Sequence, residues 1–190
     1  MATAYSQDFV TAIGRRRPEA AVEPERPAHR HEELPELIGD LCHANSGMNL
    51  PRRALADIAD GHPFFARVIE TGSHPGNLDR IARAEAEATA VDCVTFAFWS
   101  YYRPDAARQV RVLARTPASP AIPFVTSTAT PAAAVEVLRA ALRELAHNPC
   151  YANARRGLLI TDIVDVPANA YRGLLDYERE AAQLGYPVLA

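Results

Sequence analysis

The stretch RVIETGSHPGNLDRIARAEAEATAVDCVTFAFW, residues 67–99, changes twice from a strand pattern to a helix pattern. Residues 67–71 are rich in β-branched side chains, which predicts a strand, and the turn at Gly72 leads into a helix with one apolar face. Residues 89–92 predict a second short strand, which is followed directly by an apolar helix that ends at about Tyr102. Because strands alternate with helices, the sequence predicts an α/β fold with a largely parallel sheet.

The same alternation continues on both sides of this stretch. Before it, residues 47–59 have the apolar spacing of a helix, and Asn45 or Ser46 would serve as the N-cap. After it, further strands are predicted at residues 110–114, 124–127 and 158–160, and further helices at residues 131–147, with Thr130 as N-cap, and at 168–184.

The composition excludes several classes of protein. The chain has 190 residues, of which 48% are hydrophobic and 23% are charged, as in an ordinary soluble globular protein. Its 20 basic residues, all arginines, are outnumbered by 23 acidic ones, and a net charge of −3 argues against nucleic-acid binding. Charged residues or prolines interrupt every apolar run, so no insertion into a membrane is expected.

The N-terminal part of the chain differs from the rest. Residues 4–13 could form either a short strand or a short helix. Residues 14–33 hold several prolines and charges but few large apolar side chains, so little surface could be buried there to offset the entropy of ordering. The sequence therefore predicts a loose segment over residues 14–33.

Three short polar segments each stand at a predicted helix start: Asn-Ser-Gly-Met-Asn from residue 45, Thr-Gly-Ser-His from residue 71, and Asp-Cys-Val-Thr from residue 92. A helix N-terminus offers free backbone N–H groups and partial positive charge, which suit an anion. In open α/β sheets, ligands bind at the carboxyl ends of strands. Ser46, His74 and Asp92 are therefore candidate ligand-binding residues, although each segment taken alone could equally be a helix cap or a surface loop.

An enzyme can also be built from the residue types present. Cys93 could act as a nucleophile with His74 or His43 as its base, although their spacing adds no support. The six histidines lack metal-ligand spacing, the three cysteines include no CxxC pair, and Gly-rich phosphate loops are absent. No cofactor and no metal are therefore expected.

The polar segments also carry a family resemblance. They read Asn-Ser-Gly-Met-Asn-Leu at 45–50, Thr-Gly-Ser-His at 71–74 and Val-Asp-Cys-Val-Thr-Phe at 91–96, and further matching stretches lie at 112–117, 122–127 and 184–189. From about Leu41 to Ala190 the chain resembles the phosphonate/phosphate-type substrate-binding proteins of ABC transporters. Several short motifs in the family's order make this resemblance specific.

The resemblance implies a type II periplasmic binding protein, in which two α/β lobes close over a ligand. Carried over to this sequence, the family's ligand-binding residues become Ser46, Gly47, Met48, His74 and Asp92, with Thr95 as a weaker addition. The implied ligand is a small oxyanion such as phosphonate or phosphate, and the implied partner is an ABC permease. The family resemblance implies a periplasmic protein that is not an enzyme.

The sequence departs from the family's pattern at its N-terminus. Residues 1–40 are atypical where the family has part of its first lobe, so we expect that lobe to be incomplete. Residues 41–115 would form the ligand-binding α/β lobe, and residues 116–190 the crossover strand and C-terminal helices of the partner lobe. No signal peptide is recognised in the sequence as written, which by itself would indicate the cytoplasm.

Two alternatives follow from these departures. The chain could be a non-transport fragment with a broken ligand cleft, and a small Cys-dependent enzyme stays as a further hypothesis. An incomplete lobe would also leave the apolar stripe of the helix at 131–147 exposed, which predicts self-association.

Overall fold

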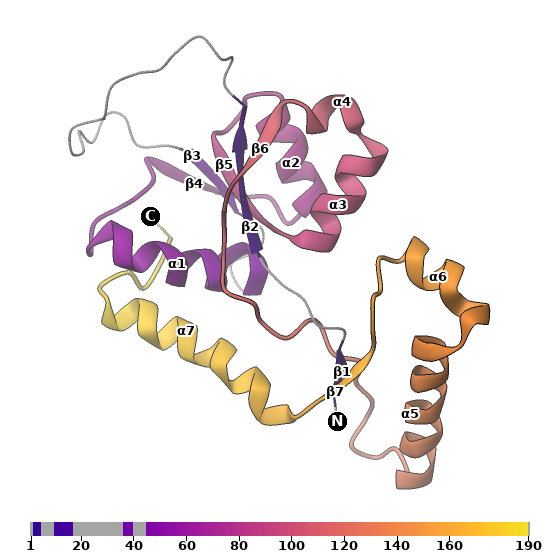
Figure 1. The fold of residues 1–190 in the computed structure, drawn as a ribbon. Coiled ribbons are helices and arrows are strands. Elements are labelled where there is room, and N and C mark those ends of the chain that lie inside the picture. The colour runs from indigo at the N-terminus through magenta and orange to yellow at the C-terminus, as the bar shows by residue number, and fades with distance from the viewer. Residues whose placement is uncertain (1, 5–9, 17–35, 40–44, 190) are drawn as a thin grey trace. The chain divides into compact units, whose positions relative to one another are not determined.

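The computed structural model describes residues 2–4, 10–16, 36–39 and 45–189. The predicted loose segment at 14–33 therefore lies largely outside the described residues. By its internal contacts the chain forms two compact units, Phe9–Pro117 with Leu174–Ala190, and Met1–Asp8 with Ala118–Gly173. They are called the larger and the smaller unit below, and the elements of each are labelled in Figure 1.

The larger unit is built on a five-stranded sheet with the order β4-β3-β5-β2-β6. The strands are β2 (Val10–Arg15), β3 (Glu36–Gly39), β4 (Arg67–Glu70), β5 (Ala88–Asp92) and β6 (Val110–Arg115). Strand β3 pairs in parallel with β4 and β5, whereas β2 pairs antiparallel with β5 and β6. Every strand except β2 thus runs in the same direction, and the predicted, largely parallel α/β sheet is confirmed. Strands β2 and β3 both come from residues 1–40.

Helices follow the strands as the alternation predicts. The larger unit holds α1 (Leu50–Ala59), α2 (His74–Ala82), α3 (Cys93–Tyr102), the short α4 (Pro104–Ala107) and most of α7 (Arg172–Gln183). The helices α2 and α3 lie together on one face of the sheet, and α1 and α7 lie together on the other (Figure 1).

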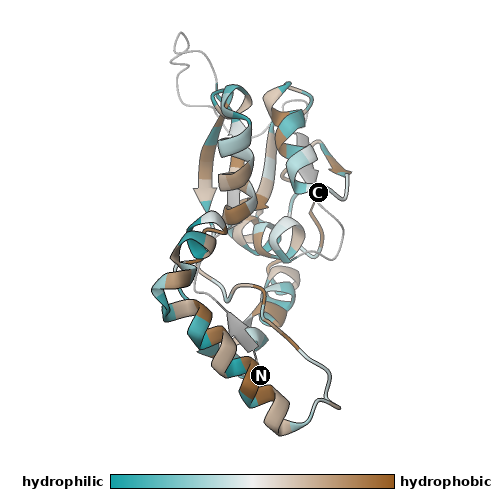
Figure 2. Ribbon diagram, turned by 90° about the vertical axis from the view of Figure 1, so that its right-hand side faces the viewer, coloured by the Kyte–Doolittle hydropathy of each residue, from teal (hydrophilic) through white to brown (hydrophobic). Residues whose placement is uncertain are grey.

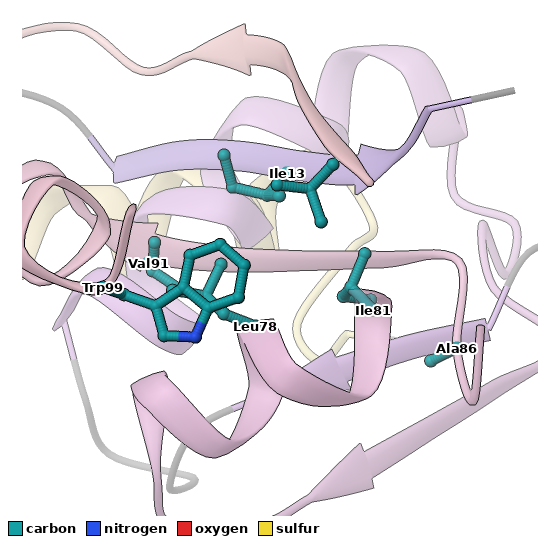
Figure 3. Close-up of a cluster of buried hydrophobic side chains, with 7 residues drawn as sticks. Ile13, Leu78, Ile81, Ala86, Val91 and Trp99 are labelled. Atoms are coloured by element: carbon teal, nitrogen blue, oxygen red, sulfur yellow. The ribbon is translucent and has the colours of Figure 1, made fainter. Parts of the chain in front are cut away.

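The main core lies between the sheet and the helices α2 and α3 (Figure 3). Ile13 and Val91 of the sheet and Leu78 and Ile81 of α2 are each 0% exposed, and Trp99 of α3 is 4% exposed. The Trp99 indole Nε1 donates a hydrogen bond to Asp79 Oδ1 at 2.8 Å, so its polar edge is satisfied while its ring is buried. This packing fixes the starts of α2 and α3 against the ends of their strands.

A second cluster joins α1 to α7 and the C-terminal residues, with Ala56, Phe65 and Ala181 among its buried members. Arg52, only 8% exposed, donates to the backbone oxygen of Pro187 at 2.7 Å. Its Nη2 also donates to Asn49 Oδ1 at 3.0 Å, whereas its buried Nε has no hydrogen-bond partner among the described residues, so the guanidinium is held by two of its three nitrogens. The C-terminal residues of the chain thus hold the helix that carries the candidate site's first segment.

The smaller unit has little sheet within its described residues. Strand β1 (Ala2–Ala4) pairs antiparallel with β7 (Val164–Val166), and the helices are α5 (Ala132–His147), α6 (Ala152–Gly157) and the 3₁₀ turns η3 (Pro149–Tyr151) and η4 (Ala168–Tyr171). The expected helix at 131–147 is confirmed. Its N-cap is Pro131, however, so the assignment of Thr130 to that position was wrong.

The helix α5 buries very little of its apolar stripe. Ala146 is its one buried residue, while Val137 is 68% and Leu138 50% exposed. Apolar and hydrophilic residues alternate along this helix (Figure 2). The apolar exposure that the sequence predicted for this helix is therefore present.

Two predicted strands of the smaller unit were wrong. Residues 124–127 hold no strand beyond an isolated bridge at Phe124, and residues 158–160 follow the end of α6. Leu159 has a φ of 57°, which is incompatible with a strand. Short apolar runs form strands only where a neighbouring strand pairs with them.

Candidate functional site

His74 is presented by a tightly held turn after β4. Gly72 adopts a φ of 71°, which glycine reaches without a steric penalty. Ser73 is then the N-cap of α2, and its Oγ accepts a hydrogen bond from the Gly76 backbone N–H at 3.1 Å. The hydroxyl of Thr71 hydrogen-bonds to Asn77, which is fully buried. These contacts fix His74 as the first residue of α2.

The two carboxylate oxygens of Asp92 have different neighbours: one caps helix α3 and the other faces His74. It ends β5 and caps α3, because its Oδ1 accepts a hydrogen bond from the Thr95 N–H at 2.8 Å. Its Oδ2 lies 3.9 Å from Nε2 of His74. The cap that the sequence suggested at Asp92 is thus present, and the capping oxygen is distinct from the one that faces His74.

Ser46 lies in the π-helical turn η2 (Asn45–Asn49), which continues directly into α1. The expectation that Asn45 or Ser46 caps α1 was wrong, because Asn49 holds the N-cap position. The Asn49 side chain instead secures the turn by donating to Asn45 Oδ1 at 3.2 Å and to the backbone oxygen of Leu174 at 2.7 Å.

The three segments converge on one imidazole. Ser46 Oγ lies 3.1 Å from His74 Nε2, the same nitrogen that faces Asp92. The side chain of His74 is 15% exposed and that of Asp92 is 39% exposed. A hydroxyl, an imidazole and a carboxylate from three successive helix starts therefore meet at one place in the larger unit.

The other predicted site residues lie nearby with different surroundings. Gly47 is buried in η2, and Met48 packs against the apolar cluster of α1 and α7. Thr95 is partly buried, and its backbone N–H is engaged by Asp92. Gly47 and Met48 both belong to the η2 turn, and Thr95 belongs to the first turn of α3.

This arrangement suits an oxyanion chemically. A hydroxyl and an imidazole N–H can donate hydrogen bonds to anionic oxygens, and the N-terminal turns add backbone N–H groups and partial positive charge. The carboxylate of Asp92 can only accept, so it favours a ligand that carries a proton of its own. The convergence thus offers donors together with one acceptor.

Cys93, the nucleophile of the enzyme hypothesis, is the first residue of α3 and is partly buried. The alternative base His43 lies outside the described residues. Across residues 2–4, 10–16, 36–39 and 45–189, no group of three or more His, Cys, Asp or Glu side chains could hold a metal ion. No helix in the described part of the chain is long and apolar enough to span a bilayer.

Comparison with known protein families defines the class. Residues 42–171 match the family described as the periplasmic substrate-binding proteins of ABC phosphonate transporters. This match spans well over half of the chain. The chain belongs to that family, which is a periplasmic transport family and not a family of enzymes. A search of curated proteins found no match.

Solved structures give the same fold. A binding-protein component of an ABC phosphonate transporter from Pseudomonas aeruginosa aligns with a TM-score of 0.72 at 13% identity, covering 96% of this chain and 63% of that one. PhnD1 from Prochlorococcus marinus, in complex with methylphosphonate, aligns with a TM-score of 0.70 at 11% identity, covering 96% and 72%. XAC2383 from Xanthomonas citri, bound to ATP, aligns with a TM-score of 0.60 at 17% identity, covering 97% and 68%.

These alignments establish the fold. The chain has the fold of a type II periplasmic binding protein, with an α/β lobe in the larger unit and a two-stranded sheet among the described residues of the smaller unit. The chain spans 63% of the length of the Pseudomonas aeruginosa protein.

Proposed function

We propose that this chain binds a small oxyanion of the phosphonate or phosphate class, as the solute-binding component of an ABC-type uptake system. The observation that carries the proposal is the meeting of Ser46, His74 and Asp92 at His74 Nε2, with distances of 3.1 and 3.9 Å. Membership of the phosphonate-binding family and the methylphosphonate bound to PhnD1 support this ligand class.

The ligand would be held by groups of three kinds. The Ser46 hydroxyl and the His74 imidazole would donate to its oxygens, and the backbone around Gly47 and Met48 would add N–H groups and helix-dipole charge. Thr95, whose backbone N–H already donates to Asp92, would add its side-chain hydroxyl. Asp92 would accept the remaining proton of the ligand. A phosphonate that keeps a proton would therefore be preferred over a fully ionised sulfonate of similar shape, which would face Asp92 without a proton to share.

The affinity should be modest. A hydrogen bond to a charged ligand contributes a net of about 1.5–3 kcal/mol, and a partly buried helix terminus contributes up to about 2 kcal/mol. A few such contacts must also offset the entropy lost on association. We therefore expect a Kd on the order of millimolar for methylphosphonate.

Calorimetric titration tests the proposal directly. Methylphosphonate should bind the wild-type chain and methanesulfonate should bind measurably more weakly. His74→Ala should remove measurable binding, whereas His62→Ala, which changes an exposed loop histidine, should leave it unchanged. Asp92→Asn retains a good N-cap for α3 but removes the charge, so it should reduce the discrimination against methanesulfonate.

The broken-cleft fragment is the second candidate. It is favoured by the small two-stranded sheet of the smaller unit within the described residues. Absence of binding by any of these anions, in a chain that still unfolds cooperatively, would support this alternative and reject the first. Delivery of the ligand to an ABC permease in the periplasm belongs to the first proposal alone.

A further inference from the structure

A groove of about 590 Å³ opens on the sheet face of the larger unit that also carries α1. Its floor is made of small residues from the two neighbouring strands β2 and β5, namely Ala12, Gly14, Ala88 and Ala90. One wall is the side of α1 that carries Leu55 and Ile58. The volume lies in the range of small-molecule binding sites, which are concave and mostly apolar.

The floor is small because of strand alternation. Successive strand residues point to opposite faces, so Ile13 and Val91 fill the core beneath α2 and α3 while their neighbours face the groove. An added Cβ on Gly14 would stand 2.6 Å from Leu113 Cδ1, so glycine lets the Leu113 side chain lie across the floor. Ile58 is 61% and Leu113 46% exposed, so the groove presents apolar surface to solvent.

The second wall is strand β6, which is an edge of the sheet and carries cationic side chains. Arg111, Leu113 and Arg115 alternate along it and all line the groove, as does Arg15 at the end of β2. None of these three arginines forms an ion pair with another described residue, although many other arginines of the chain do. The guanidinium groups thus offer unneutralised charge beside an apolar floor.

The two ends of the groove differ in charge. Glu87, the one acidic residue among those that line it, precedes β5, and the pairing of Ala88 with Gly14 places it at the end that holds Arg15. Arg115 stands four residues further along β6 than Arg111, about 13 Å away. Among the described residues that line the groove, the positive charge is therefore least compensated at the end with Arg115.

We propose that this groove binds an anionic amphiphile, a molecule with an unbranched alkyl chain of medium length and one carboxylate or phosphate head group. The alkyl chain lies on the Ala and Gly floor beside Leu55 and Leu113, and the head group pairs with Arg115. A free small anion would leave the apolar floor exposed. A second copy of this chain would bring the same arginines against each other, which costs energy. Ser46, His74 and Asp92 do not line the groove, so this site is separate from the oxyanion site.

Titration calorimetry with decanoate, kept below its micelle concentration, tests the proposal on the full chain. Decanoate should bind, and both 1-decanol, which lacks the charge, and propionate, which lacks the chain, should bind at least tenfold more weakly. Decyl phosphate tests the other head group and should bind within about tenfold of decanoate, because guanidinium pairs with either anion.

Matched variants locate the site. Arg115→Ala should weaken decanoate binding at least tenfold, while Arg108→Ala, at a residue of the same unit outside the groove whose side chain is 70% exposed, should leave it unchanged. Ala12→Leu should fill the floor and abolish binding. His74→Ala should not affect decanoate, and Arg115→Ala should not affect methylphosphonate, so failure of either proposal can be told from failure of the other.

Three results would overturn the proposal. They are the absence of decanoate binding to a cooperatively folded chain, equal binding of decanoate and 1-decanol, and equal loss of affinity in Arg115→Ala and Arg108→Ala. Circular dichroism melting of each variant establishes that the chain is folded, and Arg115 is exposed enough for its replacement to leave the fold intact.

Discussion

The helices of the two units are stabilised in different ways. In the larger unit, α2 begins with His, Pro, Gly and Asn, which are poor helix formers, yet Leu78 and Ile81 are 0% exposed. In the smaller unit, α5 is rich in Ala, Leu, Arg and Glu, which are good helix formers, yet Ala146 is its one buried residue. Tertiary packing thus holds α2, while local propensity supports α5.

The largest expected effect is in the core of the larger unit. Ile81→Ala should lower the free energy of unfolding by about 2–5 kcal/mol, because removing this fully buried side chain leaves a cavity in the core. Leu138→Ala in α5 removes a side chain of similar size that is 50% exposed, and should cost less than about 0.5 kcal/mol. Urea unfolding measures both variants, and equal losses would contradict the comparison.

A smaller effect is expected at the buried indole. Trp99→Phe removes the hydrogen bond to Asp79 while keeping an aromatic ring, and should cost about 1.5–3 kcal/mol because the acceptor is charged. Tyr102→Phe, on the same helix but 73% exposed, is the matched control and should be neutral. If both variants melt at the wild-type temperature, the hydrogen bond at Trp99 has no role in stability.

The smaller unit should show a weak loss of stability at high pH. Burial raises the pKa of the Tyr171 phenol above its usual value of 10. The unfolded chain therefore releases this proton first, so the free energy of unfolding falls as the pH rises from the unfolded pKa towards the folded one. Tyr171→Phe should remove this decline, although it also loses the bond from Tyr171 Oη to the Ala121 backbone oxygen at 3.0 Å. Urea unfolding between pH 9 and pH 11, about one unit on each side of the reference pKa, measures how the free energy of unfolding changes with pH in both proteins. Identical slopes for the wild-type chain and Tyr171→Phe would contradict the prediction.

Substitution on the exposed face of α5 is expected to have the smallest effect on stability. Its main effect should be on self-association. We predict that its exposed apolar stripe causes weak self-association, as the sequence suggested. Leu138→Glu should then lower the average mass at high protein concentration, measured by light scattering, with little change in melting temperature. A wild-type chain that is monomeric at all concentrations would reject this prediction.

Local signals in the sequence were enough to predict much of the larger unit. Residues close together in the chain determine β4, β5 and the starts of the helices that follow them. The signals are the β-branched runs of the two strands, the turn at Gly72 and the helix cap at Asp92. The convergence of Ser46, His74 and Asp92 was also predictable, because helix starts that follow parallel strands lie at one edge of a sheet.

Features that depend on distant residues could not be read in this way. Strand β3 is four residues long, and its place between β4 and β5 is set by pairing with those strands. The predicted strand at 158–160 failed for the converse reason, because Leu158 and Leu159 are 57% and 43% exposed. The turn that carries Ser46 is secured by Asn49 bonding to Leu174, far along the chain, which no local pattern reveals.

The central claim is that His74 Nε2, together with Ser46 and Asp92, contacts a phosphonate. Nuclear magnetic resonance of the histidine ring nitrogens during a titration with methylphosphonate tests it most directly, with the His74→Gln variant assigning the signal among the six histidines. We predict that the His74 ring signals move in a saturable manner while the signals of exposed His62 stay in place. Signals of His74 that do not move while methylphosphonate binds, or that move no more than those of His62, would contradict the account.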